Sequence, residues 1–237
     1  MKNTMDLILS KFGRHNDTPN HEDIMARRDH LTYRLSAASH NQNILVQAVH
    51  HSINHYDSLP AGEFERVEAI NHAIDRTSFC FDDLVFNLAS LLDYFGNYLG
   101  LFIYGPKHQT LKWSGFINKV HSETTETELF SVSKDENSMW FNRVLEYRGD
   151  VFHRKALKSE VKDYVHTYVF PQDVPAMEIL GSSSLRKYFS ILRKLDQPSL
   201  IECSNLVVAR TLEGIERIIR ATKTYKFDEK YLWVNNM

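Results

Sequence analysis

Arg148 and His153 are the residues of this sequence whose types and spacing best suit catalysis; they lie five positions apart in WFNRVLEYRGDVFHRKA, residues 140–156. A guanidinium can bind a phosphate through two parallel hydrogen bonds, and histidine gains and loses a proton near neutral pH. Without a metal, such a pair suits attack of an RNA 2′-hydroxyl on the adjacent phosphate, with histidine transferring protons and arginine stabilising the charged transition state. The spacing also arises by chance; Arg148 is then a structural ion-pair partner and His153 a surface residue.

Helical periodicity places Arg148 where a hydrophobic residue is expected. At about 100° per residue, one apolar row contains Trp140, Val144, Tyr147 and Val151. Arg148 falls inside the wider apolar sector, whereas His153 falls beyond its edge. Because an unpaired buried charge is costly in free energy, we expect a carboxylate beside Arg148.

The candidate carboxylates lie on an apolar segment at 79–104 and beside Arg148 itself. The polar residues of that segment cluster within about a third of a helix circumference: Asp82, Asp83, Asn87, Ser90, Asp93 and Asn97. We predict that one of the three aspartates pairs with Arg148 or adds a polar group to its cleft. Asp150 is a further supporting residue. The alternative is an ordinary solvent-facing stripe of an amphipathic helix.

Basic residues make the segment around the pair locally positive. Arg143, Arg154 and Lys155 are the predicted RNA-binding residues, despite the nearby acids. Basic residues also surround aromatic ones at 186–194, a composition that suits a track for single-stranded nucleic acid. The basic residues of the last predicted helix, including Arg210 and Arg217, are interpreted as a solvated helix face.

A histidine pair offers a different chemistry. His51 and His55, four residues apart, share a helix face and could ligate a metal, with His72 or His121 as the third ligand. The run HSINH lacks the glutamate of the HExxH pattern, and twelve histidines make such pairs expected by chance. We predict no metal and no cofactor, and keep a histidine-ligated metal-binding bundle as an alternative function.

Helical patterns dominate the chain. They predict helices at about 21–55, 63–104, 113–120, 182–195 and 199–225. The second is either one helix or two, with a break at Thr77–Ser78 or at Gly96 and Gly100. Asn137 or Ser138 suits the N-cap of the helix that carries Arg148.

The remaining segments lack a clear helical pattern, and we expect irregular structure in them. Residues 1–20 suggest a frayed N-terminus or a short cap, and 105–137 an irregular excursion with a polar loop at 121–138. Residues 163–170 alternate enough for a strand or an extended connector. The sequence therefore predicts an all-α fold: an antiparallel helical bundle in one domain over 1–237, with its core at about 21–160 and C-terminal helices within 182–226.

Composition narrows the class of protein. The formal charge of −2 excludes a protein that coats nucleic acid through bulk charge, so any such contact must be a local patch. Cys80 and Cys203 have no metal or redox spacing, which is typical of a reduced, cytoplasmic protein, and Cys80 is expected in the core. The N-terminus has no secretory signal. Segment 79–104 carries three aspartates, so we expect a buried helix and no membrane contact.

Residues 147–153, YRGDVFH, resemble the R-x4-6-H signature of HEPN domains. The order of a long helix, a long apolar helix, an irregular connection and the motif helix is similar to the all-α bundle of that family, over about residues 60–160. Many members are metal-independent endoribonucleases of toxin–antitoxin or phage-defence systems, and act as dimers with one composite cleft. The resemblance implies catalytic roles for Arg148 and His153, RNA as substrate, a homodimer and an antitoxin protein as partner.

Two positions depart from the family pattern. Gly149 follows the arginine where a polar residue is common, and Lys155 stands where one subgroup has a modified tyrosine. The alternative from another class is therefore a non-catalytic helical module that binds a nucleotide or a protein through the same cleft.

Overall fold

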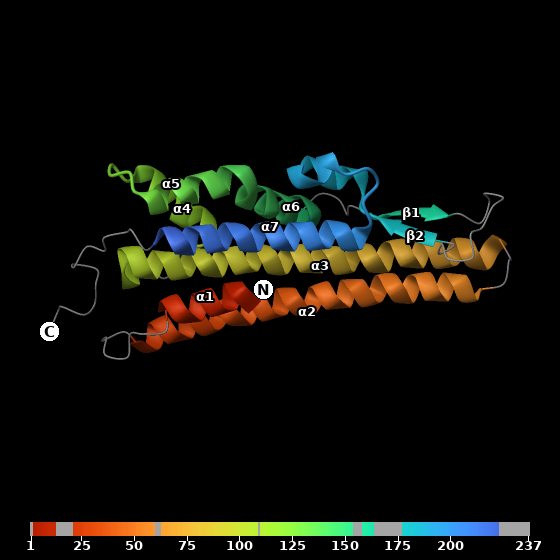
Figure 1. Cartoon of the computed structure of the whole chain (residues 1–237), viewed down its shortest axis with the longest axis horizontal. Helices are drawn as coiled ribbons and strands as arrows, with labels where there is room; N and C mark the ends of the chain where they lie inside the picture. The colour runs from red at the N-terminus through yellow and green to blue at the C-terminus, as the bar shows by residue number, and fades with distance from the viewer. Residues whose placement is uncertain are drawn as a thin grey trace. The chain divides into compact units, whose positions relative to one another are not determined.

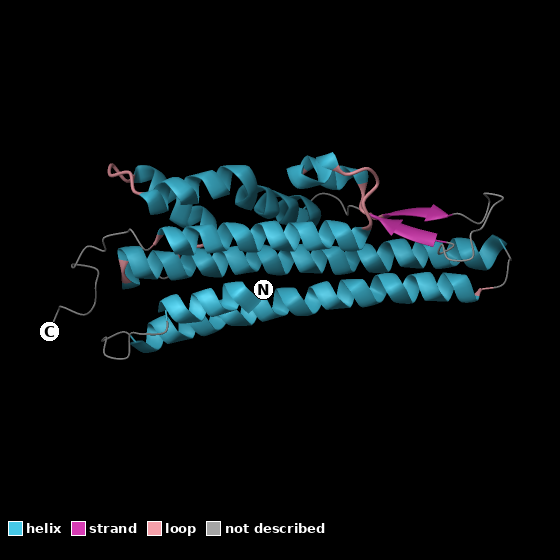
Figure 2. Ribbon diagram, in the orientation of Figure 1, coloured by secondary structure: helices cyan, strands magenta, loops and turns pink. Residues whose placement is uncertain are grey.

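The structure is a computed structural model of the 237-residue chain, and it describes residues 2–12, 21–59, 63–108, 110–153, 158–163 and 177–222. Helices dominate these residues, with one small sheet (Figures 1 and 2). The elements are α1 (Lys2–Phe12), α2 (His21–Ser58), α3 (Glu63–Tyr104), η1 (Pro106–His108), α4 (Trp113–Ser122), α5 (Glu128–Glu136), η2 (Asn137–Phe141), α6 (Asn142–His153), β1 (Glu160–Asp163), β2 (Met177–Leu180), η3 (Ser183–Lys187), η4 (Ser190–Lys194) and α7 (Leu200–Ala221). The predicted all-α helical bundle is confirmed.

The chain forms two compact units, each of which draws on α2, α3 and α7. Unit 1 contains Met1–Ser39, Asn87–Asn142 and Ala209–Met237, and unit 2 contains His40–Phe86 and Arg143–Val208. Both units contain contacts between α2 and α3. Within the described residues, no helix combines the length and the apolar character needed to cross a membrane.

Unit 1 has an aromatic core around two buried tryptophans. Trp113 stacks on Phe95, with ring centroids 6.0 Å apart, and meets Phe141 edge-on at 4.9 Å. Its indole N–H donates to Asn137 Oδ1 at 2.9 Å, and that of Trp140 donates to Thr211 Oγ1 at 2.9 Å. Because both indole donors are satisfied, these large side chains are buried without a polar penalty.

Gly96 explains why α3 passes through one predicted break without interruption. A Cβ at this position would lie 2.6 Å from the backbone nitrogen of Trp113, so α4 begins directly against α3. The glycine permits close approach of two backbones and does not end the helix.

Unit 1 also contains a buried ion-pair cluster. Glu136 is fully buried and pairs with Arg210, at 2.8 Å, and with Arg217. A Cβ at Gly214 would lie 2.7 Å from Glu136 Oε2, so the absence of a side chain there leaves room for the carboxylate against α7. Arg210 is half-buried and departs from the predicted solvated face, whereas Arg217 stays exposed, as predicted, although its guanidinium pairs with Glu136.

In unit 2, α6 packs beside α3 and η3–η4, with the two-stranded sheet following α6 in the chain. The strands are antiparallel, and their register pairs Glu160 with Leu180 and Asp163 with Met177. Tyr147 and Phe189 are fully buried, with ring centroids 5.4 Å apart. This pair places a tyrosine of α6 in the core of the unit.

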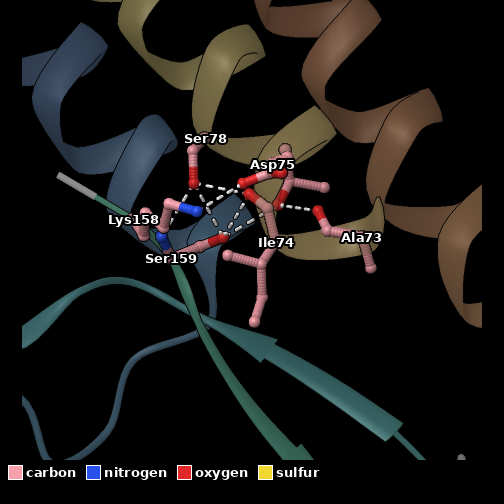
Figure 3. A network of polar contacts seen from close by, with 7 residues as sticks. Ala73, Ile74, Asp75, Ser78, Lys158 and Ser159 are labelled. Atoms are coloured by element: carbon pink, nitrogen blue, oxygen red, sulfur yellow. Dashed lines mark hydrogen bonds and ion pairs between the residues drawn. The ribbon is translucent and has the colours of Figure 1, made fainter. Parts of the chain in front are cut away.

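Helix α3 also continues through the other predicted break, where hydroxyl groups form a hydrogen-bonded cluster (Figure 3). Thr77 and Ser78 donate to the carbonyl oxygens of Ala73 and Ile74, at 2.7 and 2.5 Å. Ser159, which precedes β1, lies 3.0 and 3.1 Å from their hydroxyl oxygens, and its N–H donates to Ser78 Oγ at 2.8 Å. Serine and threonine inside a helix can bond in this way to the carbonyl four residues back, so both hydroxyls are satisfied without a break in α3.

Several local predictions are wrong. The polar loop expected at 121–138 contains α5, because Thr127 accepts a hydrogen bond from the Phe130 N–H and caps a helix there. Asn137 and Ser138 lie in the π-helix η2, so neither starts the helix that carries Arg148. Residues 182–195 form two 3-10 helices.

Other predictions have mixed outcomes. Residues 2–12 form α1, tied to α7 by a 2.7 Å hydrogen bond from Thr4 to Glu216. Cys80 is half-exposed, whereas Cys203 is buried, and burial raises the pKa of Cys203 to about 12. Of the extended segment expected at 163–170, Asp163 is the last residue of β1; residues 164–170 and those after 222 lie outside the described part of the chain.

Candidate functional site around Arg148

Helix α6 carries both residues of the Arg–His motif. It runs without a break from Asn142 through Arg148 and Gly149 to His153. Five helical residues correspond to a turn of about 140° and a rise of about 7.5 Å, so the motif spacing is held by a regular backbone. The side chain of His153, and residues Arg154 and Lys155, lie outside the described part of the chain.

Gly149 does not interrupt this helix. A Cβ added there would meet no atom within 4 Å. No close packing within the described chain therefore requires a glycine, although glycine in a helix costs stability relative to alanine. The residue leaves an open strip on α6 beside Arg148.

Arg148 is half-buried, at the margin of the apolar face. Trp140, Val144 and Tyr147 of the predicted row are buried, whereas Val151 is half-buried. Arg148 was expected within the apolar face of the helix, and the structure buries its side chain only in part. A long arginine side chain can cover apolar surface with its methylenes while its guanidinium stays accessible.

The side chain before Arg148 makes a short, buried hydrogen bond. The Tyr147 hydroxyl donates to Asp82 Oδ1 at 2.5 Å, and Asp82 is 7% exposed. Burial raises the pKa of Asp82, the hydrogen bond from Tyr147 opposes the rise and the nearby Asp83 adds to it, and the resulting pKa is about 6. Burial and then Asp82 raise the pKa of Tyr147. The Asp82 carboxyl therefore changes its charge near pH 6. It also connects α3 to α6, because it accepts the hydrogen bond of the Tyr147 hydroxyl.

The other predicted aspartates have different surroundings. Asp83 is exposed on α3. Asp93 belongs to unit 1, where its Oδ1 accepts a 3.3 Å hydrogen bond from the backbone N–H of Trp113 at the start of α4. Asp93 thus supports a helix N-terminus, where a carboxylate is favourable.

Asp150 joins α6 to η3. The Tyr188 hydroxyl donates to Asp150 Oδ2 at 2.6 Å, and Lys187 Nζ lies 3.6 Å from the same oxygen. The Tyr188 ring meets Tyr147 edge-on, with centroids 5.3 Å apart. Burial and then the bond to Asp150 raise the pKa of Tyr188. The sequence did not predict the group formed by Tyr147, Tyr188 and Lys187; its only indication was the basic and aromatic composition of 186–194.

Arg143, predicted to bind RNA, lies on the exposed side of α6. Its Nη1 pairs with Glu146 Oε2 at 2.6 Å, one helical turn away. Exposed pairs of this kind contribute little to stability. Its role in RNA binding stays a prediction, and Arg143 offers a comparison for Arg148 on the same helix, outside the catalytic pair.

The alternative metal site is not assembled in the part of the chain that the structure describes. His51 and His55 are exposed on α2, and His72 is exposed with Glu68 3.9 Å away. His121 is exposed and belongs to unit 1. Among the described residues, no three His, Cys, Asp or Glu side chains come close enough to hold a metal ion.

The region around Arg148 therefore combines a half-buried cation, an open strip at Gly149 and two tyrosine–aspartate hydrogen bonds. These groups could bind an anion at Arg148 while fixing the helix beneath it. The chain matches no protein-family model, no curated protein and no solved structure, so its likeness to HEPN domains rests on the motif and the order of helices.

Proposed function

We propose that this protein is a metal-independent endoribonuclease of the toxin–antitoxin or phage-defence type. A substrate 2′-hydroxyl attacks the adjacent phosphate, His153 transfers protons, and Arg148 binds the phosphoryl oxygens as charge develops. Two copies meet along α6, so that Arg148 and His153 of both line one cleft. An antitoxin protein is the expected regulatory partner.

The regular backbone of α6 is the observation that carries this proposal. An unbroken helix holds Arg148 and His153 at a constant spacing through Gly149, the position that departs most from the HEPN pattern. Hydrogen bonds from Tyr147 to Asp82 and from Tyr188 to Asp150 fix the residues around Arg148. Such support suits a catalytic group, whose position must be held to a fraction of an ångström.

Cleavage of total RNA in excess EDTA tests the reaction. The intact protein should leave 2′,3′-cyclic phosphate ends, and Arg148→Ala and His153→Ala should each lower the rate at least about a hundredfold. Arg143→Ala, which removes an exposed predicted RNA contact from the same helix, should lower the rate much less, because it leaves the catalytic pair intact. Expression toxicity in a host cell should disappear with His153→Ala.

Two outcomes contradict the proposal. No cleavage of any RNA by the intact protein would favour a non-catalytic module that binds a nucleotide or a protein at α6. Equal rate losses in Arg143→Ala and Arg148→Ala would show a general charge effect instead of a catalytic arginine.

A further inference from the structure

A cation and two tyrosines meet where α2 and α3 contact each other in unit 1. The Arg34 guanidinium lies 5.1 Å from the ring centroid of Tyr94 on α3 and 5.8 Å from that of Tyr33 on α2. His30, one turn before Arg34, meets the Tyr94 ring edge-on at 5.7 Å. These four residues are called the Tyr33 platform below.

The Tyr33 platform is accessible. Tyr33 is 67% exposed, and His30 is exposed as well. Arg34 and Tyr94 are half-buried. A tyrosine this exposed gains little from burial in the folded chain, so its ring is free to meet a ligand.

The charge of Arg34 is not offset by a carboxylate among the described residues. Its contacts there are the two tyrosine rings. Arg28, one and a half turns earlier, instead pairs with Asp29 at 3.0 Å. A cation held against ring faces keeps its N–H donors for an outside anion.

We propose that the Tyr33 platform binds unpaired nucleotides of a single-stranded nucleic acid. An exposed aromatic ring stacks on any base, and a guanidinium beside it binds the phosphate backbone. Because the net charge of the chain is −2, any contact with nucleic acid must be made through a local patch. A duplex hides its base faces, so a single strand is the preferred ligand. The surface lies apart from the Arg–His motif in sequence and acts without any cleavage step.

Fluorescence anisotropy with a labelled oligodeoxynucleotide of about twelve nucleotides tests binding. The probe has no 2′-hydroxyl, so the proposed cleavage cannot consume it. Tyr33→Ala should weaken binding about tenfold, and Tyr33→Phe, which keeps the ring, should stay within about twofold. Arg34→Ala should weaken binding and reduce the salt slope by about one.

Phe64→Ala is the matched control, because Phe64 is 80% exposed on α3 of unit 2 between acidic neighbours. It should bind as the intact protein does, and thermal unfolding should show that all variants fold. Three results would overturn the proposal. The intact protein does not bind the probe, or Tyr33→Ala and Arg34→Ala both bind it with unchanged affinity. The third is that a duplex or an acidic peptide binds as tightly as the single strand. If the protein binds the probe but cleaves no RNA, only the proposed nuclease function is contradicted. If it cleaves RNA but does not bind the probe at Tyr33, only the proposed role of the Tyr33 platform is contradicted.

Discussion

Two buried carboxyl groups, one in each unit, are accommodated by different partners. Glu136 of unit 1 is fully buried and contacts two guanidinium groups, those of Arg210 and Arg217. Asp82 of unit 2 is nearly as buried but accepts its hydrogen bond from the neutral Tyr147. Positive charge offsets the first carboxylate, whereas burial raises the pKa of the second to about 6. Two carboxyl groups with similar burial thus have different surroundings, a pair of cations for Glu136 and a neutral phenol for Asp82, because different helix faces pack against them.

Glu136→Gln should produce the largest effect on this comparison. It leaves two arginines without their buried counter-charge, and breaking such a pair costs roughly 3–4 kcal/mol of unfolding free energy. Urea unfolding measures the loss. Glu146→Gln, at the exposed pair with Arg143, should cost less than about 1 kcal/mol. Equal losses in the two variants would contradict the assigned role of Glu136.

Asp82→Asn should change how stability depends on pH. Because the folded pKa of about 6 exceeds the ordinary 3.8, the folded state binds the proton more tightly, and stability falls as pH rises between these values. The difference corresponds to about 3 kcal/mol, present below pH 4 and lost above about pH 6. The stability of Asp82→Asn relative to the intact protein should therefore increase across this range.

Urea unfolding at several pH values measures this difference. Ser190→Ala is the control, because it removes an exposed hydroxyl of unit 2 and no ionisable group, so its difference from the intact protein should stay nearly constant. A flat difference for Asp82→Asn would show that its carboxyl does not titrate in this range. Parallel cleavage assays would reveal whether the charge of Asp82, acting through Tyr147, alters the Arg148 helix.

Gly149→Ala should have the smallest effect on stability, and of the opposite sign. With no atom within 4 Å of an added Cβ, alanine should stabilise α6 by about 0.5–1 kcal/mol. Thermal unfolding measures the gain in stability. A loss of stability would mean that the added Cβ meets other atoms and that the surface at Gly149 is not open. A more stable protein that has lost RNA cleavage or self-association would indicate that a ligand or a second copy approaches α6 there.

Local sequence patterns were sufficient for the long helices. Apolar periodicity and the breakers at 59–62 and 105–106 predicted α2 and α3 almost to their ends, because helix formation depends on neighbours within one or two turns. At 121–138 the polar composition predicted a loop, although Thr127 is a suitable N-cap and the structure has a helix there. It also left a break open at Thr77–Ser78, where Ser159, 82 and 81 residues away, completes the hydroxyl cluster.

The sequence by itself determined the helical class, the Arg148 motif and the position of both motif residues on one helix, since these depend on residue type and spacing. Only the tertiary structure decided the partners of the buried charges. Tyr147 reaches Asp82 across 65 residues, and Arg217 reaches Glu136 across 81. Such pairings follow from which helix faces pack together, and burial makes each of them obligatory, because a buried polar group without a partner destabilises the fold.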